Sequence, residues 1–115
     1  MKFQSLVLFL LVLLVSMAKN QAKPGGYTPI KNINDPHVIE IAKFAITEHN
    51  KRVKTELHFT KVISGESQVV AGINYRLTLS ARYGSSSKSD PYVAVVYDRP
   101  QQHLRNLTYF IPINA

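Results

Sequence analysis

A single strongly predicted helix, followed only by strand-like segments, limits what this chain can fold into. Asn34-Asp35-Pro36 supplies an N-cap candidate followed by proline at the first helical position. Apolar residues then recur at helical spacing from Val38 to Val53, while polar residues occupy the opposite face. We therefore expect a helix over about residues 36–52. Phe44 falls outside the main apolar face, so periodicity does not account for it.

The chain after this helix is rich in β-branched and aromatic residues, which favour strands. Four segments bounded by turn residues are predicted to be strands: 56–64, 71–83, 92–97 and 104–113. Their connections, at 65–68, 84–91 and 98–102, are short and so favour antiparallel hairpins. A further strand over 27–31 would precede the helix. The predicted fold is α+β, with one N-terminal helix packed across a four- to five-stranded antiparallel sheet.

The beginning of the chain has the composition of a secretory leader. Residues 6–15 form an almost purely apolar run, followed by small residues suited to cleavage. We expect a signal peptide over 1–22, cleaved after Ala18 or Ala22, and a single domain over 23–115. The apolar run is about ten residues and a membrane span needs roughly 20, so no span is expected in the mature protein. The predicted location is extracellular, or vacuolar through the secretory pathway.

The 115 residues include no cysteine, which is unusual for a small exported domain because such domains often need disulfides. A thiol nucleophile and a thiolate metal site are therefore excluded. The four histidines show no metal-ligand spacing, and the sequence has neither a nucleophile elbow nor a phosphate-binding loop. His49 lies on the apolar face of the predicted helix, where a packed, hydrogen-bonded histidine is expected instead of a base or ligand. We predict no cofactor, no metal and no enzymatic activity.

The formal net charge of +7 makes the chain basic, and a basic surface can attract nucleic acid, anionic lipid or an acidic protein. The positive residues are spread along the chain. Their densest cluster, Lys51, Arg52 and Lys54, falls where the helix should end, and cations there complement the helix dipole. No RNA-binding signature accompanies it, so no nucleic-acid partner is expected.

An unbroken apolar triplet, Val69-Val70-Ala71, lies between a polar segment and a strand-like run. At a hairpin tip these side chains would stand in water with no core to bury them, which is typical of a docking surface. An ordinary buried strand with a bulge at Gly72 explains the same segment equally well.

Three motifs resemble the cystatins, the reversible inhibitors of papain-like cysteine proteases. Gln68-Val69-Val70-Ala71-Gly72 matches their Gln-x-Val-x-Gly signature. Residues 41–50, Ile-Ala-Lys-Phe-Ala-Ile-Thr-Glu-His-Asn, are similar to the helix signature of plant cystatins, which accounts for Phe44. Gly25-Gly26 matches the glycine pair that begins the inhibitory N-terminal segment in that family. The resemblance runs from Gly25 to about Ile113.

This resemblance implies a wedge that occludes the protease active-site cleft reversibly, competitively and without a covalent step. Its protease-binding residues would come from an N-terminal segment and two hairpin loops: Gly25 and Gly26; Gln68, Val69, Val70, Ala71 and Gly72; and Pro100 and Gln101. The alternative is a non-inhibitory basic defence or binding protein on the same scaffold, acting through its charged surface.

Two departures from the family pattern bear on affinity. The second loop normally reads Pro-Trp, whereas here it reads Pro100-Gln101, so a large aromatic contact is missing. Lys23-Pro24 stands upstream of the glycine pair, where an apolar side chain is more usual.

Association and modification complete the sequence predictions. We expect a monomer, with a domain-swapped dimer as the alternative, because β-branched Val69 and Val70 at a tight loop predict backbone strain that an opened hairpin would relieve. Such a dimer would hide the loop and lose inhibition. Asn106-Leu107-Thr108 is an acceptor sequence for N-glycosylation in a chain with a secretory leader.

Overall fold

The predicted helix is present as α1 (Pro36–Val53), within one residue of the expected bounds. The carboxylate of Asp35 accepts a hydrogen bond of 2.8 Å from the backbone N–H of His37 and so caps the helix. The helix ends at Lys54, whose left-handed backbone (φ 57°) lets its N–H donate to the carbonyl of Asn50. Lys51 and Arg52 occupy the last turn, where their charge complements the helix dipole.

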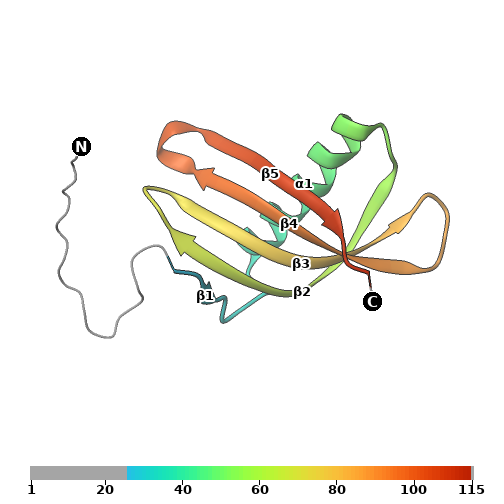
Figure 1. Cartoon of the computed structure of the whole chain (residues 1–115), viewed down its shortest axis with the longest axis horizontal. Helices are drawn as coiled ribbons and strands as arrows, with labels where there is room; N and C mark the ends of the chain where they lie inside the picture. Colours follow the sequence, from blue (N-terminus) through green and yellow to red (C-terminus); the bar gives the residue numbers. More distant parts are fainter. Residues whose placement is uncertain (1–25, 115) are drawn as a thin grey trace.

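The structure, a computed structural model, describes residues 26–114. Its strands form one antiparallel sheet in the order β1-β2-β3-β4-β5, and α1 packs across one face of that sheet (Figure 1). The strands and one 3-10 turn are β1 (Thr28–Pro29), β2 (Leu57–Val69), β3 (Ile73–Tyr83), β4 (Ser89–Arg99), η1 (Pro100–Gln102) and β5 (Leu104–Pro112). The α+β prediction is confirmed. The predicted signal peptide and Gly25 lie outside the described residues.

The core lies between α1 and the face of the sheet that it covers. Five helix residues are buried there: Val38, Ile41, Ala42, Ala45 and Ile46. They pack against buried residues of four strands: Leu57, Val62, Tyr75, Leu77, Leu79, Ala81, Ala94, Val96 and Leu107. Each large aliphatic side chain buried in this way contributes about 1.5–3 kcal/mol. Phe44, which periodicity leaves unexplained, is half-buried against this core.

The expected connection at 65–68 is wrong, because these residues belong to β2. Gly65 and Glu66 pair with Leu77 and Arg76 across the β2–β3 ladder. Gly65 serves packing instead of a turn, since a Cβ there would lie 2.7 Å from a methyl carbon of Leu77. Its carbonyl also accepts a hydrogen bond from Ile30, just after β1. This polar, glycine-containing segment is therefore part of β2. It lies within the sheet because β1 pairs along its other edge.

The remaining strands differ from the predictions mainly in length. β1 is only the pair Thr28–Pro29, shorter than the expected 27–31. β4 runs over Ser89–Arg99 instead of 92–97, because Ser89 and Asp90 pair with Arg82 and Ala81 of β3.

The connections collect at opposite ends of the sheet. The β2–β3 turn (residues 70–72, the first turn) and the β4–β5 turn (residues 100–103, the second turn) lie at the end where the chain enters β1 (Figure 1). We call this the hairpin end. The β3–β4 connection (residues 84–88) lies at the other end, near the last turn of α1, which we call the serine-loop end. Among residues 26–114, no helix is long and apolar enough to cross a membrane.

Candidate functional site

The first turn carries apolar side chains into solvent. Val69, the last residue of β2, pairs with Ile73, the first of β3, so the chain reverses through only three residues. The Val69 side chain is 76% exposed and Val70 is 36% exposed. The apolar triplet therefore stands at a hairpin tip, and the alternative of a buried strand is wrong.

Backbone strain in the first turn falls on a different residue from the one predicted. The sequence suggests strain at the two β-branched valines, but the residue in the left-handed region is Ala71 (φ 58°). A non-glycine residue there costs of order 1 kcal/mol and persists because its surroundings hold it. Gly72 follows with φ 152°, a conformation that side chains rarely adopt.

Tyr97 of β4 holds the first turn in place. Its hydroxyl donates a 2.9 Å hydrogen bond to the carbonyl of Ala71. The same ring explains Gly72, since a Cβ there would lie 2.6 Å from the Tyr97 oxygen. The first turn is therefore braced by the neighbouring hairpin. Sequence reasoning missed Tyr97, because only the pairing of Asn74 with Tyr97 brings the two segments together.

Gln68, predicted to belong to the binding loop, lies in β2 below the first turn. It pairs with Asn74 of β3, and its Oε1 accepts a 3.0 Å hydrogen bond from the Asn74 side-chain amide. The side chain is half-buried. Its observed contact closes the base of the hairpin.

The second turn presents Pro100 and three polar side chains, and the apolar residue Leu104 follows it as the first residue of β5. Pro100–Gln102 form a single 3-10 turn, and His103 ends it with φ 52° and an N–H donated to the carbonyl of Pro100 at 2.9 Å. Gln101 is exposed. Leu104 closes the turn by pairing with Arg99, and its side chain is 44% exposed.

A charged network fixes the base of the second turn to the helix. The Asp98 carboxylate, only 3% exposed, accepts a 2.9 Å hydrogen bond from Nε of Arg105 and lies 3.2 Å from Nε2 of His37. Arg105 also donates to Glu40 of α1 at 2.8 Å. The bond to Asp98 raises the pKa of Arg105, and the bond from Arg105 lowers the pKa of Glu40. Hydrogen bonds of this charge-assisted kind are stronger than neutral ones. They join residues far apart in sequence, so no local pattern predicts them.

The N-terminal segment reaches the same end. Thr28 pairs with Ser67 of β2, and continuing this antiparallel register brings Gly26 beside Val69. The Tyr27 ring lies 4.0 Å from the guanidinium of Arg76. Arg76 is itself held by Glu66 through a 2.8 Å hydrogen bond from Nε. Gly26 therefore lies at the hairpin end, whereas Gly25 is outside the described residues.

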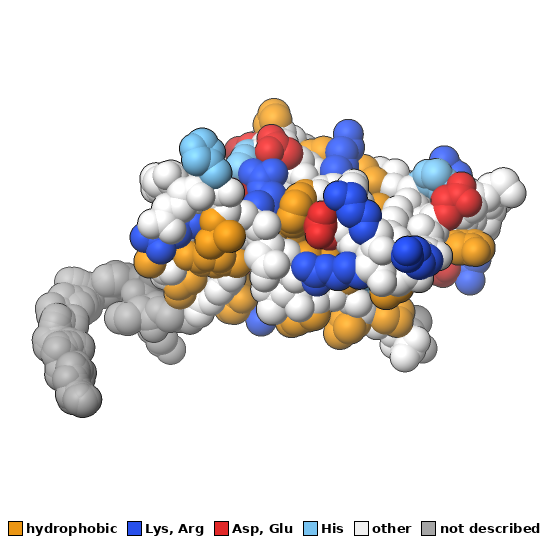
Figure 2. Space-filling model, turned by 90° about the horizontal axis from the view of Figure 1, so that it is seen from above, with side chains coloured by type: hydrophobic (Ala, Val, Ile, Leu, Met, Phe, Trp, Pro, Cys, Tyr) orange, Lys and Arg blue, Asp and Glu red, His pale blue; other side chains and the backbone are white. Residues whose placement is uncertain are grey.

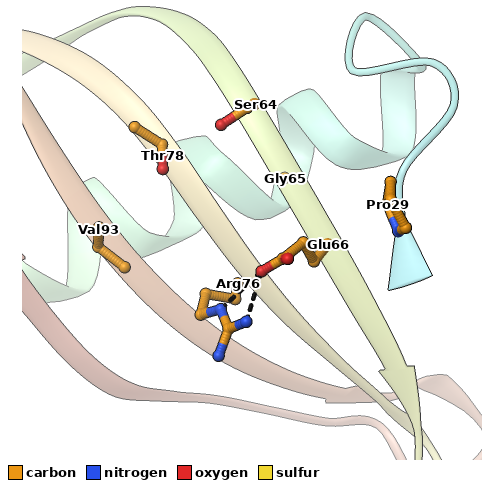
Figure 3. Close-up of a pocket in the computed structure, with 7 residues that line it drawn as sticks. All are labelled: Pro29, Ser64, Gly65, Glu66, Arg76, Thr78 and Val93. Carbon is orange, nitrogen blue, oxygen red and sulfur yellow. Dashed lines mark hydrogen bonds and ion pairs between the residues drawn. The ribbon is translucent and has the colours of Figure 1, made fainter. Parts of the chain in front are cut away.

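The Arg76–Glu66 pair lines a shallow pocket of about 400 Å³ on the sheet face opposite α1 (Figure 3). Figure 3 shows the two side chains meeting over β2 and β3, with Pro29 of β1 beside them. The guanidinium is committed both to the carboxylate and to the Tyr27 ring. We interpret the pocket as the support of the N-terminal segment.

Charge and titratable groups give no sign of a second kind of site. Lys and Arg side chains are distributed over the face in Figure 2, with acidic side chains between them. Residues 26–114 contain no group of three or more His, Asp and Glu side chains able to hold a metal ion. His49 is packed as predicted, stacked on Phe110 with 4.1 Å between ring centroids, and burial lowers its pKa. The hairpin end, with its exposed apolar turn, is the candidate docking surface.

The amino-acid sequence is similar to those of known protease inhibitors. The chain is 46% identical over 112 residues to "Cysteine proteinase inhibitor 5" of Arabidopsis thaliana, covering 97% of this chain and 91% of the relative. Residues 30–113 match the family model described as SQAPI, aspartic acid proteinase inhibitor.

Solved structures agree with the observed fold. A salivary cystatin from the soft tick Ornithodoros moubata superposes with a TM-score of 0.68 at 25% identity, covering 80% of this chain and all of that chain. The squash aspartic acid proteinase inhibitor superposes with a TM-score of 0.60, also at 25% identity, covering 87% of this chain and all of the squash protein. The names of the Arabidopsis thaliana relative and of the squash protein thus print two different target classes, cysteine proteinases and aspartic acid proteinases.

Proposed function

This chain belongs to the plant cystatins, a family of protease inhibitors and not of enzymes, and from that premise we propose that it inhibits papain-like cysteine proteases. The proposed inhibition is reversible, competitive and non-covalent. The hairpin end would enter the active-site cleft and exclude substrate, leaving both proteins chemically unchanged.

The observation that carries this proposal is the exposure of Val69 and Val70 at a turn that Tyr97 braces through a hydrogen bond to Ala71. Apolar side chains in water gain free energy when a partner buries them, by roughly 25 cal/mol per Å². A turn held in one conformation loses little entropy on binding, so more of that gain appears as affinity. Gly26 and Pro100 lie at the same end and could enter the cleft together.

Steady-state inhibition of papain tests the proposal. We expect the apparent inhibition constant to rise with the concentration of peptide substrate, as competition requires, and the protease activity to return on dilution. Mass spectrometry should find the inhibitor uncleaved. Cleavage of the chain, or full papain activity at excess inhibitor, would contradict the proposal.

A second target class is favoured by one specific observation, the match of residues 30–113 to the family described as an aspartic acid proteinase inhibitor. The squash inhibitor of that description shares the fold at 25% identity. We propose aspartic proteinases as the alternative target. Pepsin, assayed at acidic pH beside papain, separates the two. Inhibition of pepsin with papain left fully active would make the aspartic class the target.

We also propose that the protein is exported and glycosylated at Asn106. Support comes from the apolar run at residues 6–15 and from the exposure of Asn106 on the outermost strand β5. An attached glycan there would face solvent. Mass spectrometry of protein purified from the medium of a plant-cell culture should find the residue 106 peptide carrying hexosamine. An unmodified peptide would contradict the proposal.

We propose the monomer as the inhibitory form. Opening the strained turn at Ala71 would release β2 from β3 and allow two chains to exchange α1 and β2. The exposed tip would then become continuous strand. Separate assays of the size-exclusion fractions should find inhibition in the monomer and none in such a dimer.

A further inference from the structure

Large apolar side chains are exposed at several places on the molecule, and those at the hairpin end come from both turns. Val70 belongs to the first turn and Val69 directly precedes it, while Leu104, 44% exposed, closes the second turn. The sheet pairs Ile73 with Asp98, so the two turns start from neighbouring positions on adjacent strands. Leu104 therefore shares the end of the molecule that carries the exposed valines.

Within the second turn itself only Pro100 is apolar, and the other three side chains are polar. Gln101 and Gln102 are exposed and polar, and His103 is exposed as well. Burying amides or an imidazole against a protein costs desolvation unless each polar atom finds a hydrogen-bond partner. Leu104 carries no such cost, since only its water-exposed apolar surface would be removed.

We infer that Leu104 is the apolar contact through which the second turn binds the target protease. This inference rests on the proposed function and assigns a further specificity-determining residue to the same docking surface. Leu104 lines a shallow groove of about 380 Å³ together with Phe44 of α1, Pro100 and three polar residues, Asp98, His103 and Arg105. An apolar side chain of the protease would lie against Leu104 at the open edge of this groove.

Leu104 is also held in position from both sides. Its backbone pairs with Arg99, and the next residue, Arg105, is anchored to buried Asp98 and to Glu40. The side chain thus stands on a fixed strand end instead of a mobile loop. A side chain on a fixed strand end loses little entropy on binding, so more of its apolar burial appears as affinity.

The experiment compares Leu104 with Ile111, an aliphatic residue of similar exposure at the other end of β5. Ile111 is 50% exposed, lies seven residues further along β5, and is therefore roughly 20 Å away. Ala and Asp are introduced at each position. Inhibition constants for papain are measured well below the midpoint of thermal unfolding of every variant.

Leu104→Ala should weaken inhibition about three- to tenfold, as expected for losing part of one leucine contact. Leu104→Asp should weaken it about 30-fold or more, because a carboxylate would be buried against the protease. Ile111→Ala and Ile111→Asp should change it less than about twofold. If Leu104→Asp does not fold, Leu104→Ala alone decides.

The outcomes separate the inference from the proposed function. A wild-type protein that leaves papain active overturns both. A wild-type protein that inhibits, with Leu104→Ala unchanged, overturns only the assignment of Leu104. Equal losses at Leu104 and Ile111 would also overturn it, since the effect would then not belong to the second turn.

Discussion

The two ends of the sheet reverse the chain with similarly short connections but hold them in different ways. Both ends have local bonds, such as Ser86 N–H to the carbonyl of Tyr83 at the serine-loop end and Val70 N–H to the carbonyl of Gly72 at the hairpin end. The long-range bond of the serine-loop end is made by the backbone, from Gly84 N–H to the carbonyl of Glu56. At the hairpin end it is made by a side chain, because the Tyr97 hydroxyl reaches the carbonyl of Ala71, 26 residues away.

Exposure alone does not separate these ends. Tyr83, at the serine-loop end, is 62% exposed, more than Val70 or Leu104. What distinguishes the hairpin end is apolar surface at turns that side chains of neighbouring elements brace, whereas residues 85–88 of the serine-loop end are all polar. Binding free energy is reduced by the entropy that flexible side chains and loops lose in the complex. Apolar surface on a braced turn therefore contributes more to affinity than the same exposed area on a flexible one.

Charge placed on the first turn should have the largest effect. Val69→Asp and Val70→Asp should each weaken inhibition of papain about 100-fold or more, because an unpaired carboxylate in a closed interface costs several kcal/mol. Both residues are exposed, so the free energy of unfolding should change little. Tyr83→Asp, at the serine-loop end, is the control and should leave the inhibition constant within about twofold. If Tyr83→Asp weakened inhibition as much as the two valine variants, the two ends of the sheet would not differ in protease binding.

An aromatic residue in the second turn should strengthen the hairpin end. Gln101→Trp places a large apolar side chain on an exposed position of η1, and its burial should tighten inhibition about five- to 150-fold, or roughly 1–3 kcal/mol. Most of the gain should be slower dissociation, measured by surface plasmon resonance. A folded, monomeric variant with an unchanged constant would mean that residue 101 does not reach the protease.

Removing the brace of the first turn should have a moderate effect. Tyr97→Phe deletes the hydroxyl that donates to Ala71 and leaves the ring that packs against Gly72. A hydrogen bond of this kind contributes about 0.5–1.5 kcal/mol, so inhibition should weaken about two- to twelvefold. Tyr109→Phe, 40% exposed on β5, is the matched control and should have no effect. Identical constants for both variants would show that the brace does not support binding.

Replacing His49 should change how stability depends on pH without changing inhibition at the hairpin end. Burial lowers the pKa of His49 below its ordinary 6.5, so the folded state favours the neutral ring. Its stabilising effect is fully present above the unfolded pKa and is lost as pH falls through the folded pKa. His49→Phe should therefore lose less stability than the wild type between pH 7 and 5, measured by urea unfolding. Its papain inhibition should be unchanged, and identical pH profiles of stability would contradict the assignment.

Local patterns predicted the elements that local chemistry determines. Asp35 and Pro36 define the start of α1, and helical periodicity defines its buried face. The apolar triplet at Val69 raised the question of a hairpin tip, and the family resemblance decided in favour of it. The pattern failed at Gly65, where glycine serves packing against Leu77 instead of a turn.

The parts that sequence could not predict depend on strand register. Tyr97 meets the first turn because Asn74 and Tyr97 pair across β3 and β4. Asp98 meets Arg105 and His37 because β4, β5 and the start of α1 converge there. Register follows from side-chain packing across the whole sheet, and so no local motif marks these residues. The prediction of strain at Val69 and Val70 is wrong for the same reason. The strained backbone is that of Ala71, which Tyr97 holds through a contact that no local sequence pattern indicates.

The most direct test of the central claim is amide hydrogen exchange of the inhibitor, free and bound to papain. We predict slower exchange at residues 70–73 and 101–104 in the complex, with exchange at residues 84–88 unchanged. The serine-loop end thus serves as the internal control within one molecule. Protection confined to residues 84–88, or spread over the sheet face away from α1 with none at the two turns, would contradict the account.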